Sequence, residues 1–226
     1  MNILAERFEE KNSQKIQVAQ VRKRKHNICM SFFMKGKNMA QAKTLTEAEF
    51  QQVLNYINTR KFALRNRTMF LISHWSGMRV GEIASLKVRD VLSANGMVKG
   101  EIRLSPEQTK GRQARTVYLP KKLQDALAEF ITCRCINSPE EPVFYTANGI
   151  GFSANSLCQL FFWLYRKAGV EGASSHSGRR SFITSLASKG ISVRVLASMA
   201  GHRSISTTQV YIDVNDDMKR KAVELI

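Results

Sequence analysis

The stretch from Ser174 to Tyr211 holds side chains of the kinds that can act on a phosphate. It contains His176 and Arg179, which stand three positions apart and would share one face of a helix. His202 and Tyr211 follow, so that a cation, two imidazoles and a phenol fall within one short segment. Such groups are suited to gripping a phosphate oxygen while a hydroxyl attacks the phosphorus. We therefore expect phosphoryl chemistry near this end of the chain.

A second candidate group centres on Arg79, which stands between a predicted helix stop at Gly77 and a predicted helix start at Val80. Backbone amides and a guanidinium would converge there, as they do where proteins hold a phosphate oxygen. Glu82 follows three positions later and is close enough to fix the orientation of the guanidinium. On the local pattern alone, an ordinary surface ion pair explains these two residues more simply.

Lys110 lies in a Thr-Lys-Gly turn between two predicted strands. A lysine at the tip of a hairpin can swing and present a proton, whereas one lying flat on a sheet cannot. Lys99 belongs to the preceding strand, and Arg112 is poorly suited because a guanidinium rarely gives up its proton. Taken alone, Lys110 is an ordinary solvated turn residue.

In order and spacing these residues resemble the catalytic boxes of the tyrosine recombinase (phage integrase) family. The second box has the form His-x-x-Arg, followed by Gly-His, Thr-Thr and a tyrosine nine positions after that histidine. The resemblance extends from Thr44 to about Val214. Gly178 and Arg180 stand where the family often has leucine and histidine, and Ala200 where leucine is common, which puts the local packing in question.

The resemblance implies a DNA recombinase that works through a 3′-phosphotyrosine, and it assigns one role to each candidate. Two arginines would grip the scissile phosphate, an acid would support them, and a lysine would protonate the leaving 5′ oxygen. One histidine would take the phenol proton and the other would donate to the non-bridging oxygens, while the phenol would attack. Arg79 and Arg179 are the two arginines, Glu82 is the acid and Lys110 is the lysine. His176 would take the phenol proton, His202 would donate to the oxygens, and Tyr211 carries the phenol.

Two other functions remain open at this point. A type IB topoisomerase uses similar chemistry without synapsis, and a non-catalytic DNA-binding regulator could be built on the same fold. The family resemblance also implies double-stranded DNA as the partner, a homotetramer on synapsed DNA that is a monomer or weak oligomer alone, and an accessory directionality factor. Neither a phosphate-binding glycine loop nor a metal motif is apparent, so we expect no cofactor and no metal.

The composition agrees with a nucleic-acid partner. The chain has 226 residues and a formal net charge of +17, and so much uncompensated charge favours a polyanion. No apolar run is long enough to span a bilayer and no secretory signal is apparent. The four cysteines form no disulfide framework, so we expect reduced thiols in a cytoplasmic protein. The family resemblance implies a bacterial or phage-encoded protein associated with the nucleoid. The basic residues expected to contact DNA are Arg22, Lys23, Arg24, Lys25, Arg112, Arg180 and Arg203.

Periodicity predicts a mainly α fold with a small antiparallel β-sheet (α+β), as the resemblance also implies. A capping box at Thr46 opens an amphipathic helix, and alternating apolar residues between Val98 and Leu119 predict two or three strands. A further short strand is expected at 142–145. Helices are predicted at 65–75, 80–86, 123–131, 154–168, 178–188, 193–200 and 206–212.

Three regions are expected along the chain. Residues 1–43 are a basic arm or a partly ordered extension, with native translation starting at Met39 as an alternative. Residues 44–214 form the catalytic domain, and the short leader resembles that of family members without a full core-binding domain. Residues 215–226 form a tail helix that docks on a neighbouring protomer or packs on its own domain. Its apolar stripe consists of Met218, Ala222, Leu225 and Ile226.

Overall fold

The computed structural model describes residues 42–212 together with Arg220, Val223 and Glu224. The chain divides into two units, Met1–Gln41 and Ala42–Ile226, and only the second contains described residues. The predictions for the basic cluster at 22–25, for a start at Met39 and for the apolar tail stripe therefore lie outside the described residues.

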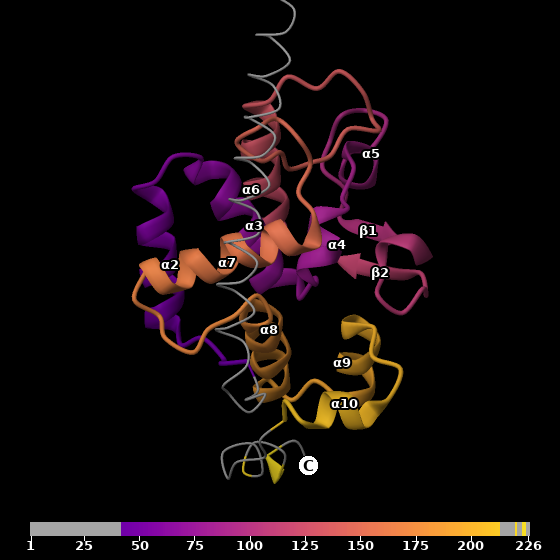
Figure 1. Cartoon of the computed structure of the whole chain (residues 1–226). Coiled ribbons are helices and arrows are strands. Elements are labelled where there is room, and N and C mark those ends of the chain that lie inside the picture. Colours follow the sequence, from indigo (N-terminus) through magenta and orange to yellow (C-terminus); the bar gives the residue numbers. More distant parts are fainter. Residues whose placement is uncertain (1–41, 213–219, 221–222, 225–226) are drawn as a thin grey trace, which may run out of the picture. The chain divides into compact units, whose positions relative to one another are not determined.

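The fold is mainly helical with one two-stranded antiparallel sheet, which confirms the predicted fold class (Figure 1). A single 3-10 turn, η1 (Pro106–Gln108), lies between the two strands. In the described residues the strands are β1 (Glu101–Leu104) and β2 (Arg115–Tyr118), and the helices are α2 (Glu47–Asn58), α3 (Ala63–Ser76), α4 (Val80–Ala84), α5 (Val88–Val91), α6 (Lys121–Thr132), α7 (Ala154–Lys167), α8 (Ser177–Ser188), α9 (Val193–Ala200) and α10 (Ile205–Gln209).

The helix ends follow from local chemistry. At the start of α2 the Thr46 hydroxyl accepts from the Glu49 amide at 3.2 Å, and the Glu49 carboxylate accepts from the Thr46 amide at 3.0 Å. This is the predicted capping box. Gly77 ends α3 with φ 66° and Gly201 ends α9 with φ 62°. These left-handed conformations favour glycine, because it has no Cβ to clash.

The hairpin pairs Glu101 with Tyr118 and Leu104 with Arg115. Alternation places Ile102 and Leu104 in the core and leaves their neighbours exposed. The further strand expected at 142–145 is not formed, because this segment makes only isolated bridges, to Lys87 and Gly151. Val143 and Phe144 in its middle are nevertheless buried, so the apolar pattern marked burial rather than strand pairing.

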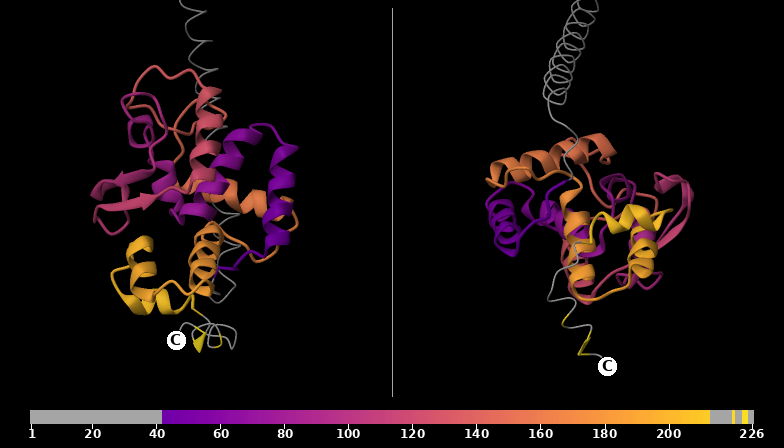
Figure 2. Two further views of the ribbon diagram at one scale, coloured as in Figure 1. Left: turned by 180° about the vertical axis from the view of Figure 1, so that it is seen from behind. Right: turned by 90° about the horizontal axis from the view of Figure 1, so that it is seen from below.

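The C-terminal helices assemble on α3. Helix α8 packs on α3, α9 packs on α8, and α10 packs on α9. Figures 1 and 2 show α8, α9 and α10 gathered on one side of α4 and the hairpin, with α7 crossing over α3 and α4. This arrangement brings the ends of α3 and α9 close to the start of α4. Arg79 lies at the start of α4, His202 follows α9, and Arg179 reaches the ends of α3 and α9 from α8.

Two general expectations can be compared with the described part of the chain. Cys133, Cys135 and Cys158 are free thiols, while Cys29 lies outside the described residues. None of the described helices combines the length and the apolar character that a membrane span requires.

Gly178 is needed for close packing of α8 on α3. A Cβ at this position would lie 2.5 Å from the Ser73 Oγ and 3.1 Å from the Ser73 backbone carbon, which cannot move aside cheaply. We expect Gly178→Ala to lower the free energy of unfolding by about 1–3 kcal/mol through overpacking, measured by chemical denaturation.

Gly81 provides the matched control because it too is the second residue of its helix. A Cβ there would lie 3.6 Å from Ala154, which is an ordinary contact. Gly81→Ala should therefore leave the free energy of unfolding unchanged or raise it by up to about 1 kcal/mol. Equal effects of the two substitutions would contradict the packing argument.

Candidate active site

Arg79 and Glu82 form a pair at the start of α4, as the sequence predicted. Arg79 is the N-cap residue, and the Glu82 carboxylate accepts from its backbone amide at 2.8 Å and from its Nη1 at 3.0 Å. Glu82 is only 1% exposed. The pair is therefore built into the interior, which rules out the simpler interpretation of a surface ion pair.

Arg115 also donates to the Glu82 carboxylate, and the sequence did not predict this third residue. It opens β2, and its Nη2 and Nε reach the Glu82 carboxylate at 2.6 and 3.3 Å. Burial alone would raise the pKa of Glu82, but hydrogen bonds and charge from Arg115 and Arg79 outweigh it and lower that pKa. The signal was present in the alternation of β2, because Arg115 shares the inward face with the buried Val117. A buried arginine requires an anionic partner.

Three consecutive carbonyls at the end of α9 accept from three arginines. Arg115 Nη1 donates to the Met199 carbonyl at 2.7 Å, Arg179 Nη2 donates to the Ala200 carbonyl, and Arg79 Nη2 makes a long contact of 3.5 Å to the Gly201 carbonyl. The last carbonyls of a helix lack intrahelical partners and carry partial negative charge, so they suit cations. The helix end thus gathers the three guanidinium groups at one place.

Arg179 is held on a second side by the end of α3, where its Nη1 donates to the Gly77 carbonyl at 2.7 Å. The residue is 5% exposed. Burial, with repulsion from Arg79 and Arg115, lowers the pKa of Arg179 to about 9, which leaves the group charged at neutral pH. Arg79 and Arg179, the two arginines predicted to share a phosphate, therefore lie on the same side of the molecule.

His202 lies in the turn after α9 and contacts Arg179. The distance from Arg179 Nη2 to His202 Nε2 is 2.9 Å, and that from His202 Nδ1 to Thr208 Oγ1 is 2.8 Å. Because a guanidinium can only donate, Nε2 accepts and the proton is assigned to Nδ1. Burial, followed by the charges of Arg179, Arg79 and Arg115, lowers the pKa of His202 to about 4, so the ring is neutral. To donate to a phosphate from Nε2, His202 would have to release Arg179.

His176 is the N-cap residue of α8 and does not lie inside its first turn, so it precedes the helical face that the spacing suggested. The residue is exposed, yet partial desolvation of its ring, with the charges of Arg179, Arg79 and Lys110, lowers its pKa. Lys110 is exposed on the connection between β1 and β2, as predicted. Because the charge of Lys110 contributes to the lowered pKa of His176, the lysine belongs to the same site.

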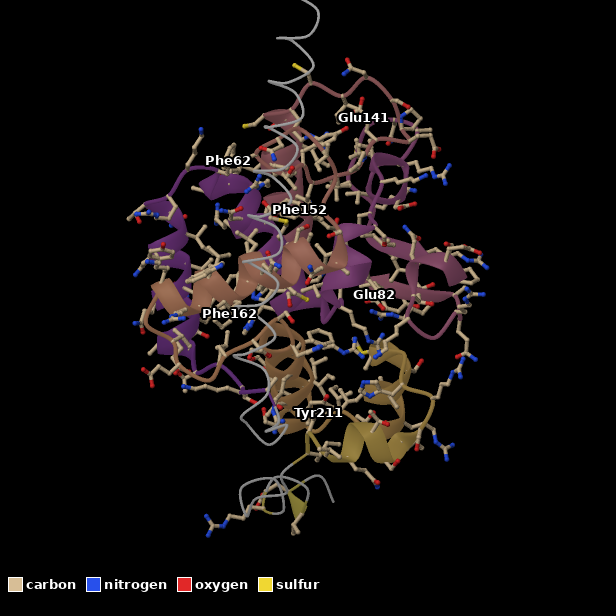
Figure 3. The ribbon with its side chains drawn as sticks, viewed as in Figure 1. Phe62, Glu82, Glu141, Phe152, Phe162 and Tyr211 are labelled. Carbon is tan, nitrogen blue, oxygen red and sulfur yellow. The ribbon has the colours of Figure 1, made fainter. Side chains whose placement is uncertain are left out.

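Tyr211 follows α10 and lies against its own domain. The Tyr211 ring is stacked on the His202 ring, with the two centroids 6.0 Å apart. The Arg180 guanidinium lies over the Tyr211 ring, 5.3 Å from the ring centroid. The Thr184 hydroxyl lies 3.4 Å from the Tyr211 carbonyl oxygen. Figure 3 shows Tyr211 beside α8 and α10, and Glu82 at the edge of α4 that faces α9.

Three of the predicted DNA-contact residues lie around this site. Arg180 donates from Nε to the Thr44 hydroxyl at 3.0 Å, and Arg203 donates from Nη2 to the Gly111 carbonyl at 2.6 Å. Arg112 is exposed near the turn that carries Lys110 and has a φ of 49°. The cluster at 22–25 lies outside the described residues. Within the described part of the chain, no three His, Cys, Asp or Glu side chains gather so as to hold a metal ion.

Several known proteins are similar to this chain over most of its length. Residues 43–218 match the phage integrase family. Tyrosine recombinase XerA of Pyrococcus furiosus is 30% identical over 185 residues, which are 80% of this chain and 61% of that protein. Tyrosine recombinase XerC of Lactobacillus leichmannii is 29% identical, over 74% of this chain and 57% of that protein. The chain thus spans about three fifths of the length of these curated relatives.

Solved structures show the same fold. A crystal structure of XerA recombinase superimposes with a TM-score of 0.65 at 22% identity, covering 83% of this chain and 66% of that one. A structure of the Tn1549 transposon integrase in complex with a circular intermediate DNA gives a TM-score of 0.67 at 20% identity, covering 84% and 68%.

The Glu82 pair predicts a specific dependence of stability on pH. Because the folded-state pKa of Glu82 is lowered, its contribution is present above the unfolded value of about 4.5 and is lost as the pH falls through the folded value. We expect Glu82→Gln to lower the free energy of unfolding by about 3 kcal/mol at neutral pH, because Arg115 and Arg79 lose the buried carboxylate that pairs with both of them. Below about pH 4.5 the difference in the free energy of unfolding between Glu82→Gln and the wild type should become smaller.

Urea denaturation at a series of pH values measures this gap, and Glu129→Gln is the control. Glu129 forms an exposed pair with Arg67 at 3.1 Å, so its loss should cost less than about 1 kcal/mol. A gap for Glu82→Gln that is no larger than that of the control, or that stays constant into acid, would contradict the assignment.

Proposed function

The chain belongs to the phage integrase family, and we propose that it is a site-specific tyrosine recombinase that cuts and rejoins DNA. One observation carries most of the support. The guanidinium groups of Arg79 and Arg179 reach adjacent carbonyls at the end of α9, directly beside the ring of His202. The Tyr211 ring stacks on His202. A phosphate seated between the two cations would therefore have a phenol of the same chain beside it.

In the proposed reaction the Tyr211 oxygen attacks the phosphorus and the bond from phosphorus to the 5′ oxygen breaks. His176 takes the phenol proton, since its lowered pKa keeps it neutral and able to accept. Lys110 gives a proton to the departing 5′ oxygen. The products are a 3′-phosphotyrosine and a free 5′ hydroxyl. The ester keeps the bond energy, so a hydroxyl of another strand can reseal it without a high-energy cofactor.

The arginines supply the electrostatic part of the mechanism. The five-coordinate phosphorus carries more negative charge than the ground state, and donors already aimed at it stabilise that charge without reorganising. Loss of one such donor typically costs about 10²–10³-fold in rate. Arg79 and Arg179 are oriented by Glu82 and by the helix-end carbonyls, so they would meet the phosphate in fixed positions.

The proposal includes partners and an organisation along the chain. Residues 44–214 would be the catalytic domain, which binds double-stranded DNA in the cytoplasm and forms a tetramer on synapsed sites. Residues 1–43 would be a basic arm along the phosphate backbone, and 215–226 would dock on a neighbouring protomer. Arg112 and Arg180 would add backbone contacts. Two observations support DNA as the partner: the net charge of +17, and the circular intermediate DNA bound in the structure of the Tn1549 transposon integrase.

The direct test is covalent trapping with a nicked suicide duplex carrying the target site, which releases a short fragment and so prevents resealing. We expect a protein–DNA adduct on a denaturing gel with the wild type and none with Tyr211→Phe, because phenylalanine has no nucleophilic oxygen. Tyr118→Phe is the matched control, since Tyr118 is an exposed tyrosine on β2. It should form the adduct at the wild-type rate. An adduct that persists in Tyr211→Phe would remove Tyr211 from this role.

The histidines predict how adduct formation depends on pH. The pKa values of His176 and His202 both lie below the ordinary 6.5, so the neutral imidazoles persist into mild acid. At subsaturating DNA the rate reports the free protein. It should therefore stay constant as the pH falls to about 6.5 and should decrease only below that value. His176→Gln should react more slowly than the wild type, and its rate should decrease less as the pH falls below this value. A limb centred above 6.5 in the wild type would contradict the proposed base.

A further inference from the structure

The turn that carries Lys110 is fixed at its base by Thr109. The Thr109 hydroxyl accepts from the Gln113 amide at 3.1 Å and lies 2.9 Å from the Gln113 carbonyl and 3.2 Å from the Pro106 carbonyl. Thr109 is 8% exposed, whereas Lys110, Gly111 and Arg112 are exposed beyond it. The base of the turn is thus rigidly closed, while its three-residue tip projects from the hairpin.

Arg203 joins this tip to the opposite side of the site. Its Nη2 donates to the Gly111 carbonyl at 2.6 Å, across 92 positions of the chain. Gly111 directly follows Lys110, and Arg203 directly follows His202. In the described part of the chain, every other hydrogen bond made by residues 109–113 is to a residue of the connection between β1 and β2. Arg203 is therefore the contact that sets where the tip lies relative to His202.

From this geometry we propose that Arg203 is a positioning residue, which holds the turn of Lys110 against the His202 segment so that the lysine reaches the leaving 5′ oxygen. The inference rests on the proposed function and deepens it. Arg203 touches no reacting atom in this scheme and acts through the Gly111 carbonyl. The sequence-based expectation for Arg203 was instead a direct contact to the DNA backbone.

The physical reason is that a lysine on an exposed turn has two sources of freedom, its long side chain and the turn itself. A misplacement of about 1 Å can cost about 10²-fold in rate when a proton must be delivered to one atom. One solvent-exposed hydrogen bond adds little to global stability. Its loss should therefore change the chemistry without unfolding the protein.

A substrate with sulfur in place of the bridging 5′ oxygen separates positioning from DNA contact. With this substrate the Tyr211 oxygen bonds to phosphorus, the phosphorus–sulfur bond breaks, and a thiolate leaves with the electron pair. A thiol has a pKa near about 8.5, far below that of an alcohol, so the leaving group needs no proton. The sulfur substrate therefore bypasses Lys110 and anything that only positions Lys110.

We expect Arg203→Ala to form the adduct about 10–100-fold more slowly than the wild type on the oxygen substrate and within about 3-fold of it on the sulfur substrate. Lys110→Ala should show the same rescue to a greater degree. Arg203→Lys should retain much of the rate on oxygen, because an ammonium can still donate to the Gly111 carbonyl. Arg112→Ala removes a charge from the same turn but keeps the bond between Arg203 and Gly111. The ratio of its rates on the oxygen and sulfur substrates should therefore equal that of the wild type.

Two results would overturn the inference. One is an equal loss by Arg203→Ala on both substrates, which is the signature of a DNA contact. The other is no loss on either substrate. If Lys110→Ala is rescued by sulfur and Arg203→Ala is not, the positioning role fails and the proposed function stands. If the wild type forms no adduct with either substrate, the proposed function itself fails.

Discussion

The site depends on the bonding of arginine side chains to the carbonyls at the end of α9. Met199, Ala200 and Gly201 each face a different arginine, contributed by β2, α8 and the start of α4. Segments that are far apart in the chain are thereby fixed to one helix end. That helix end is followed directly by His202 and, after α10, by Tyr211. The same contacts that hold the fold together at this point therefore also set the positions of the side chains proposed to react.

Charge balance explains how three arginines can lie together in one cluster. Arg79, Arg115 and Arg179 lie together, and Glu82 is the carboxylate that neutralises part of their charge. Carbonyl dipoles at the ends of α3 and α9 supply further partial negative charge. The three arginines and Glu82 still carry a net positive charge, of which the single negative charge of a DNA phosphodiester would neutralise a part. The left-handed glycines Gly77 and Gly201 end these helices, and a Cβ at Gly201 would lie 2.6 Å from the Arg115 side chain.

Much of this could be predicted from local sequence, and the failures share one cause. The capping box at Thr46, the stop at Gly77 and the alternation in the hairpin are encoded within a few residues, and each was predicted. The bond between Glu82 and Arg115 spans 33 positions, and that between Arg203 and Gly111 spans 92. Contacts of this kind arise only when the fold brings distant segments together. The segment at 142–145 failed for the same reason, since its burial depends on neighbours that sequence periodicity does not identify.

The strengths of the individual contacts indicate how a phosphate would enter. Arg179 is fixed through two carbonyls and is almost fully buried, whereas Arg79 reaches the Gly201 carbonyl only at 3.5 Å and is 24% exposed at its side chain. The weak contact of Arg79 and the bond from Arg179 to His202 would yield first, since a charged oxygen is a stronger acceptor than a carbonyl or a neutral imidazole. The bonds to Gly77, Ala200 and Glu82 would remain and keep both guanidinium groups in place. Release from Arg179 would free Nε2 of His202, but the proton is assigned to Nδ1, which contacts Thr208. His202 would therefore donate to the phosphate only after its ring turns away from Thr208 or its proton moves to Nε2.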